Sequence, residues 1–162
     1  MGRCSLTVPT SFLDDDRYMR RALQRARQAA RLGEVPVGAV VTRDGIEVSW
    51  GFNLREHHQD PSAHAEFIAM RRAAAALGSW RLEGCVVYVT LEPCPMCAGL
   101  MVQSRISRCV YGATDPKGGY CGTLHDLSNI PELNHAFDVR SGVHAEASSD
   151  LLRDFFRALR RR

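Results

Sequence analysis

The chain has 162 residues, of which 45% are hydrophobic and 24% are charged, and its formal net charge is +3. This length fits one domain that buries its own core without disulfide bonds, and a charge this small neither requires nor excludes a nucleic-acid partner. No stretch approaches the ~18 apolar residues of a membrane span, and residues 1–12 lack a signal-peptide core and a myristoylation pattern. We therefore expect a cytoplasmic, non-membrane protein with a flexible tail of residues 1–12 and a single domain of residues 13–162.

The first half of the domain predicts a helix followed by a β-hairpin. Residues 14–32 combine an apolar stripe with five arginines between Arg20 and Arg31, and they begin with three aspartates and end at a glycine. This pattern favours an amphipathic helix that the aspartates cap and whose charged face is solvated rather than bound to nucleic acid. Asp44-Gly45, between residues 37–41 and 47–53, is a strong hairpin signal.

Helices and strands alternate through the rest of the chain. Residues 85–91 form a continuous apolar, β-branched run, which is typical of a central strand buried on both faces. The other expected segments are a polar loop at 54–59, helices at 60–78, 95–104 and 150–160, strands at 108–112 and 136–140, and an irregular segment at 113–135. That irregular segment is long enough for the crossover that two parallel strands require. The sequence thus predicts an α/β fold with three α/β/α layers around a mixed five-stranded sheet, its last two strands parallel.

Two short stretches carry the chemistry: His64-Ala65-Glu66 and Pro93-Cys94-Pro95-Met96-Cys97. One imidazole and two thiolates suit zinc, and a catalytic zinc keeps its fourth position for water. H-x-E followed by P-C-x-x-C is typical of zinc-dependent nucleobase deaminases, in which the glutamate moves protons. We expect His64, Cys94 and Cys97 to hold zinc off the amino ends of two helices, with Glu66 as the catalytic base.

Other interpretations of these residues remain open. A Cys-x-x-Cys pair also occurs in redox sites and in structural zinc sites, and a structural site needs a fourth protein ligand. The spare candidates for that ligand are His57, His58, His125 and His135. Cys85 and Cys109 lie in apolar strand-like runs and are expected to be free, buried thiols in a reducing compartment.

Several segments resemble the bacterial tRNA-specific adenosine deaminases, members of the cytidine/deoxycytidylate deaminase superfamily. They are residues 34–40 (EVPVGAV), 60–66 (DPSAHAE), 88–99 (YVTLEPCPMCAG), 104–106 (SRI), 111–117 (YGATDPK), 133–135 (LNH) and 154–157 (DFFR). The resemblance covers about residues 14–161 and implies a cytidine-deaminase-like fold, one zinc ion per subunit and a homodimer. It further implies conversion of the wobble adenosine to inosine in the anticodon loop of an arginine tRNA.

The resemblance also implies residue roles. Zinc would activate water for attack on C6 of a flipped-out adenine, and Glu66 would carry protons to N1 and to the departing ammonia. Asn53 would bind the base, and Asp115 and Lys117 would contact the ribose and backbone beside it. Tyr120-Cys121 stand where the family usually has small residues, which bears on the shape of this loop.

The carboxyl end adds a basic surface, because five arginines fall within residues 153–162. Phosphate contacts by such a surface make binding salt-dependent. By the resemblance, the RNA-facing end of the last helix would comprise Phe155, Phe156, Arg157 and Arg160. The two phenylalanines would either stack on bases or pack in the core.

Two alternative functions use the same residues. A deaminase of free guanine, cytosine or cytidine shares the zinc chemistry, but it has little use for Asp115-Pro116-Lys117 or for an arginine-rich last helix. A non-catalytic RNA-binding module that keeps zinc for stability has no use for Glu66 as a proton carrier.

Overall fold

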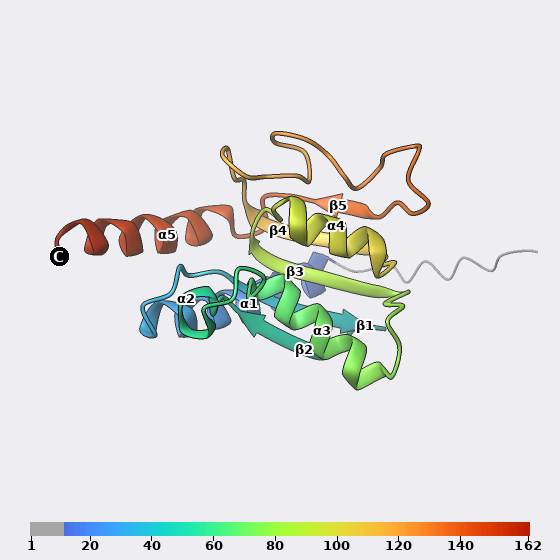
Figure 1. Cartoon of the computed structure of the whole chain (residues 1–162), viewed down its shortest axis with the longest axis horizontal. Helices are drawn as coiled ribbons and strands as arrows, with labels where there is room; N and C mark the ends of the chain where they lie inside the picture. The colour runs from blue at the N-terminus through green and yellow to red at the C-terminus, as the bar shows by residue number, and fades with distance from the viewer. Residues whose placement is uncertain (1–11) are drawn as a thin grey trace, which may run out of the picture.

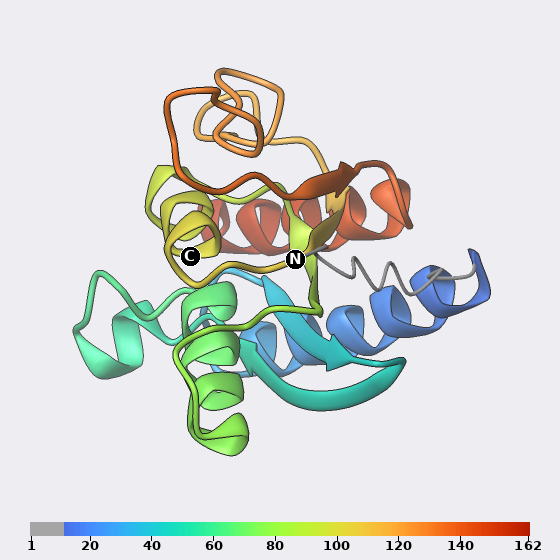
Figure 2. The same cartoon turned by 90° about the vertical axis from the view of Figure 1, so that its right-hand side faces the viewer.

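The structure is a computed structural model that describes residues 12–162. Its sheet has the strand order β2-β1-β3-β4-β5 and comprises β1 Gly38–Arg43, β2 Ile46–Phe52, β3 Cys85–Leu91, β4 Arg108–Ala113 and β5 Asp138–Arg140. The helices are α1 Phe12–Arg31, α2 Arg55–His58, α3 Ala65–Leu77, α4 Pro95–Gln103 and α5 Ala145–Arg160 (Figure 1). Figure 2 shows α3 and α4 on one face of the sheet and α1 and α5 on the other. The predicted α/β fold with three layers is confirmed.

Strand directions follow the expectation from loop lengths. β1 pairs antiparallel with both β2 and β3, and the Asp44-Gly45 hairpin connects β1 to β2. β3 runs parallel to β4, and β4 runs parallel to β5. The predicted parallel pairing of the last two strands is therefore confirmed.

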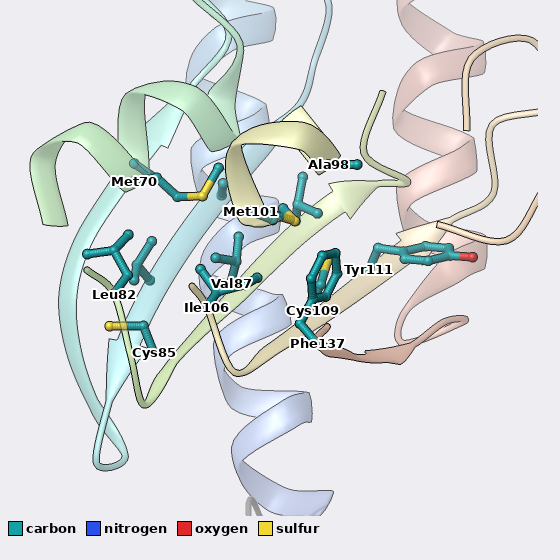
Figure 3. Packing of buried hydrophobic residues seen from close by; sticks show 14 of the residues in the cluster. Met70, Leu82, Cys85, Val87, Ala98, Met101, Ile106, Cys109, Tyr111 and Phe137 are labelled. Carbon is teal, nitrogen blue, oxygen red and sulfur yellow. The ribbon is translucent and has the colours of Figure 1, made fainter. Parts of the chain in front are cut away.

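The central strand β3 is buried along both faces. Val87 and Val89 pack with α3 and α4, whereas Val86 and Tyr88 pack with α1. Figure 3 shows Met70 and Met101 beside Val87 in the first of these clusters. Cys85 and Cys109 are free and fully buried, as predicted, because their thiols serve as small apolar groups. Residues 92–94, which follow Leu91, are therefore attached to a strand that is packed on both faces.

The first helix starts at Phe12, two residues before its predicted start, so the aspartates lie inside the helix instead of capping it. Asp15 is fully buried, and its two carboxylate oxygens accept hydrogen bonds of 2.8 Å from Nη1 and Nη2 of Arg108. Arg140 donates to the same carboxylate, and the Tyr88 hydroxyl donates to it at 3.2 Å. Asp15 therefore joins α1 to β4 and β5.

The last helix starts at Ala145, five residues before its predicted start. His144 precedes it in a left-handed conformation with φ 54°, and the Nε2 atom of His144 lies 2.7 Å from Oδ1 of Asp16 on α1. β5 is shorter than predicted, because the Phe137 amide donates to the Ser128 carbonyl instead of to a neighbouring strand. Both boundaries depend on contacts between distant parts of the chain. Within residues 12–162, no helix is both long and apolar enough to cross a membrane.

Candidate functional site

His64 stands immediately before α3 rather than inside it. We expected this helix to begin at residues 60–61, but it begins at Ala65. Asp60 instead closes a turn, since its Oδ1 accepts hydrogen bonds from the amide and the hydroxyl of Ser62 at 2.8 and 2.7 Å. Such side-chain to backbone bonds compete with helix formation. His64 is extended (φ −77°, ψ 153°) at the N-cap position, so its imidazole reaches past the amino end of the helix.

The two cysteines occupy the matching end of α4. Cys94 is the N-cap residue with an extended backbone (φ −74°, ψ 173°), and Pro95 takes the first helical position, where its missing N–H costs nothing. Cys97 follows in the first turn and is fully buried. The structure thus places the three candidate ligands at the amino ends of two helices, as expected from their positions in the sequence.

The three candidate ligands have the spacing of a zinc site. Nδ1 of His64 lies 3.6 Å from Sγ of Cys94 and 3.6 Å from Sγ of Cys97, and all three ligand atoms lie within 4.8 Å of one another. A nitrogen and a sulfur bound to one tetrahedral zinc ion at ordinary bond lengths are about 3.6 Å apart. The residues therefore fit zinc.

No fourth protein ligand joins this cluster among the residues that the structure describes. Two of the spare histidines have other partners: Nδ1 of His57 is 3.5 Å from Glu34, and Nε2 of His135 is 2.7 Å from the Ile106 carbonyl oxygen. A structural zinc site closed by four side chains is thus disfavoured. Three protein ligands are the set that catalytic zinc sites use.

Hydrogen bonds among the three candidate ligands favour the thiolate form of Cys94. Hydrogen bonds from Cys97 and His64 lower the pKa of the Cys94 thiol to about 4. The hydrogen bond to Cys94, followed by burial, raises the pKa of Cys97 well above the usual range, and the hydrogen bond with Cys94 raises the pKa of His64. Zinc binding displaces such shared protons, because thiolate and neutral imidazole are the ligand forms.

Glu66 lies in the first turn of α3, two residues after His64, and is only 4% exposed. Burial raises the pKa of its carboxyl group to about 7. A carboxyl group whose pKa lies near neutrality can both take up and release a proton.

Glu66 lines a pocket of about 190 Å³ together with His64, Cys94, Asn53 and Asp115. Asn53 is fixed in place: its Nδ2 donates to the Val35 carbonyl at 3.3 Å, and its Oδ1 accepts from the Arg55 amide at 3.2 Å. Two of the three candidate metal ligands, His64 and Cys94, therefore line one cavity with the predicted proton-transfer and base-binding residues. A wider groove of about 890 Å³ along β2 contains none of them, so volume alone does not identify the site.

All but one of the remaining predicted residues line a second groove, of about 460 Å³, beside α5. Lys117, Phe156, Arg157 and Arg160 line it, together with Leu152 and Arg153. Phe156 is 40% exposed, whereas Phe155 does not line the groove and packs edge-on against Phe156 with ring centroids 5.4 Å apart. In Figure 1 the carboxyl end of α5 projects away from the sheet.

Sequence reasoning missed two parts of this site. Residues 54–59 were expected to be a loop, but residues 55–58 form the single-turn helix α2, whose Arg55 lines the pocket. Buried Glu34 accepts hydrogen bonds from the amides of Glu56 and His57, and so holds α2 from 22 residues upstream. Glu92 also lines the pocket; it lies within the family-like segment 88–99, but the sequence assigned it no role.

Comparisons with known proteins agree with this geometry. The family model described as MafB19-like deaminase matches residues 13–160. The chain is 49% identical over 148 residues to the tRNA-specific adenosine deaminase of Bacillus subtilis strain 168, covering 91% of this chain and 92% of that protein. It is 45% identical to the same-named protein of Haemophilus influenzae over 147 residues, which are 90% of this chain and 85% of the relative.

A solved structure from studies of A-to-I editing by tRNA:A34 deaminases at the wobble position of transfer RNA superposes with a TM-score of 0.81. It shares 43% sequence identity and covers 84% of this chain and 99% of its own. Together with the zinc-compatible cluster and the buried glutamate beside it, these matches show that the chain is a deaminase enzyme and belongs to the tRNA-specific adenosine deaminase family.

Proposed function

We propose that this hydrolase converts the wobble adenosine of an arginine tRNA to inosine within the anticodon loop, with one zinc ion per chain. The observation that carries the proposal is the single pocket that joins His64 and Cys94 to Glu66 and Asn53. The names of two similar relatives support tRNA as the substrate. A base in an anticodon loop is already partly unstacked, so flipping it into such a pocket costs little.

The proposed mechanism assigns one task to each side chain. His64, Cys94 and Cys97 would hold a zinc ion, which would supply Lewis-acid activation of a water molecule for attack on C6 of adenine. Glu66 takes one proton from that water and delivers it to N1 of the base. It then takes the second proton from the new C6 hydroxyl and delivers it to the amino group, which leaves as ammonia. Asn53, fixed by its two backbone hydrogen bonds, orients the base. Asp115 at the pocket rim contacts the ribose.

The groove beside α5 is the proposed phosphate-binding surface. Replacing Lys117, Arg157 and Arg160 together by alanine is expected to weaken binding of an anticodon stem-loop. It should also flatten the plot of log affinity against log salt concentration by about two units, since each lost phosphate contact removes about 0.7. A titration at several salt concentrations measures both effects. The matched control replaces Arg20, Arg27 and Arg31, three exposed arginines of α1, and should leave the slope nearly unchanged.

The substrate is tested by comparing the deamination of three candidate compounds. The purified protein is incubated with an arginine-tRNA anticodon stem-loop, with free guanine and with cytidine, and the expected product is inosine in the RNA alone. Deamination of guanine or cytidine without inosine formation would replace the proposed function with that of a small-molecule deaminase. Tight RNA binding without any deamination would instead support the non-catalytic module.

Three further properties belong to the same proposal. Residues 13–162 form the deaminase domain, and two chains associate as a homodimer. Apolar side chains of Leu54, Phe67 and Ile68 around a pocket of about 330 Å³ at α3 support a contact surface there. The free cysteines support a reducing compartment such as the cytoplasm.

A further inference from the structure

Glu92 is a buried carboxylate, 2% exposed, at the end of the central strand. It stands between Leu91, the last residue of β3, and Pro93-Cys94, which carry a candidate zinc ligand. In the part of the chain that the structure describes, none of the ion pairs includes Glu92. A buried carboxylate needs compensating hydrogen bonds, so the partners of Glu92 define its role.

All of these partners come from one loop, residues 115–123. Oε1 of Glu92 accepts hydrogen bonds from the amides of Cys121 at 3.1 Å and Thr123 at 3.0 Å. Oε2 accepts from the amide of Asp115 at 3.0 Å and from the Thr123 hydroxyl. The carboxylate thus gathers both ends of the loop around itself.

The loop is packed tightly against this carboxylate. A Cβ atom placed on Gly119 would lie 2.2 Å from Oε2 of Glu92 and 2.7 Å from the backbone oxygen of Asp115, so a larger residue there would displace the loop. The Tyr120 amide also donates to the Pro93 carbonyl at 2.9 Å, one residue beyond Glu92. These hydrogen bonds fix the backbone of Tyr120 and Cys121 against the segment that precedes Cys94, and Cys121 is buried.

The same loop carries two of the proposed RNA contacts. Asp115 lines the pocket that holds His64 and Glu66, and Lys117 lines the groove beside α5. Oδ1 of Asp115 accepts from the Lys117 amide at 2.9 Å, so the two residues are oriented together. The position of both relative to Cys94 therefore depends on Glu92.

We propose that Glu92 is a positioning residue that holds the RNA-contacting loop in register with the zinc-ligand turn. It acts through Asp115 and Lys117 and exchanges no proton with the substrate. The inference rests on the function proposed above, because it concerns how the stem-loop is held at that site. Its expected signature is a loss of substrate affinity rather than of chemistry.

The test is a KM against kcat comparison for Glu92→Gln with the anticodon stem-loop. Glutamine keeps the shape but turns an N–H group toward amide donors, and we expect KM to rise about tenfold, which corresponds to the loss of one or two hydrogen bonds. The kcat at saturating RNA should stay within about threefold, as for a lost contact made equally in ground and transition states. A fall in kcat with KM unchanged would overturn the positioning role.

A double-mutant cycle shows whether Glu92 acts through the loop. In a background of Asp115→Ala and Lys117→Ala, the added Glu92→Gln change should raise KM no further. Glu34→Gln is the matched control, since Glu34 is equally buried and also accepts hydrogen bonds from backbone amides, but from those of α2 instead of the 115–123 loop. The effect of Glu34→Gln on KM should persist in that background. Full additivity for Glu92→Gln would contradict the proposal.

A milder variant covers the case in which Glu92→Gln does not fold. Thr123→Val removes only the hydroxyl that donates to Glu92, at an exposed residue, and is expected to raise KM about threefold with kcat unchanged. An unchanged KM for Thr123→Val would count against the proposal. Inosine formation by the wild-type protein separates the two levels: its absence rejects the proposed function, whereas normal wild-type activity with an unchanged KM in both variants rejects only the role of Glu92.

Discussion

Replacing Glu66 by glutamine is expected to lower the rate of inosine formation by a factor of about 10²–10⁴ or more while leaving the fold intact. An amide cannot take the proton from the attacking water or return it to the base and the departing ammonia. Glu66 is buried beside the ligands in a pocket shared with Asn53, and glutamine has nearly the same volume. The loss should therefore fall on the chemical step. Single-turnover inosine formation at saturating stem-loop measures it.

Metal content decides whether this loss is catalytic or structural. Elemental analysis should find one zinc per chain in both the wild-type protein and Glu66→Gln, because His64, Cys94 and Cys97 supply all the proposed ligands. Cys97→Ser should lose zinc and activity together. Glu83→Gln, at an exposed glutamate paired with Arg81, serves as the control and should keep the wild-type rate. Loss of zinc from Glu66→Gln, or a wild-type rate in that variant, would contradict the assigned role.

The features that could be predicted from sequence are those that depend on neighbouring residues. The run 85–91 has no alternation of apolar and polar residues, and it is the central strand buried on both faces. The Asp44-Gly45 turn and the Cys94-x-x-Cys97 spacing are likewise local, and both gave the correct arrangement. His64 lies 30 residues before Cys94, but the motif H-x-E followed by P-C-x-x-C allowed both residues to be assigned to one site.

The features that could not be predicted depend on partners far along the chain. Nothing near residues 55–58 indicates a helical turn, because the group that accepts hydrogen bonds from the amides of this turn is the distant Glu34 carboxylate. The start of α5 depends on contact between His144 and Asp16, and the loop around Tyr120-Cys121 depends on Glu92. In these cases the local sequence contains the groups that donate the hydrogen bonds, but it does not reveal which distant residue accepts them. Two of the three cases, α2 and the loop of residues 115–123, lie beside the candidate site. These parts of the site were therefore harder to predict than its metal cluster.

Asp15, in the first turns of α1, gives the largest expected effect on stability. Asp15→Asn should lower the free energy of unfolding by about 3–5 kcal/mol at pH 7, since it removes the buried carboxylate to which Arg108 and Arg140 both donate. Arg108 and Arg140 both depend on this carboxylate, and their side chains are only 17% and 33% exposed. β5 has just three residues, so its attachment to the sheet relies on Arg140 as well as on the strand ladder. Urea unfolding followed by circular dichroism measures the change.

The pH dependence of that difference identifies its electrostatic origin. Burial alone raises the pKa of Asp15, but the hydrogen bonds and charges of Arg108 and Arg140 outweigh it and leave the pKa below its usual value of 3.8. A depressed folded-state pKa gives stability that is fully present above pH 3.8 and is lost as the pH falls through the folded-state value. The gap between the wild-type protein and Asp15→Asn should therefore be constant from pH 7 to about pH 5 and narrow below pH 3.8. Asp150→Asn, at an exposed aspartate that pairs with Arg153 within α5, should change stability far less. A gap that stays the same size at low pH would mean that Asp15 acts by shape and packing instead of by charge.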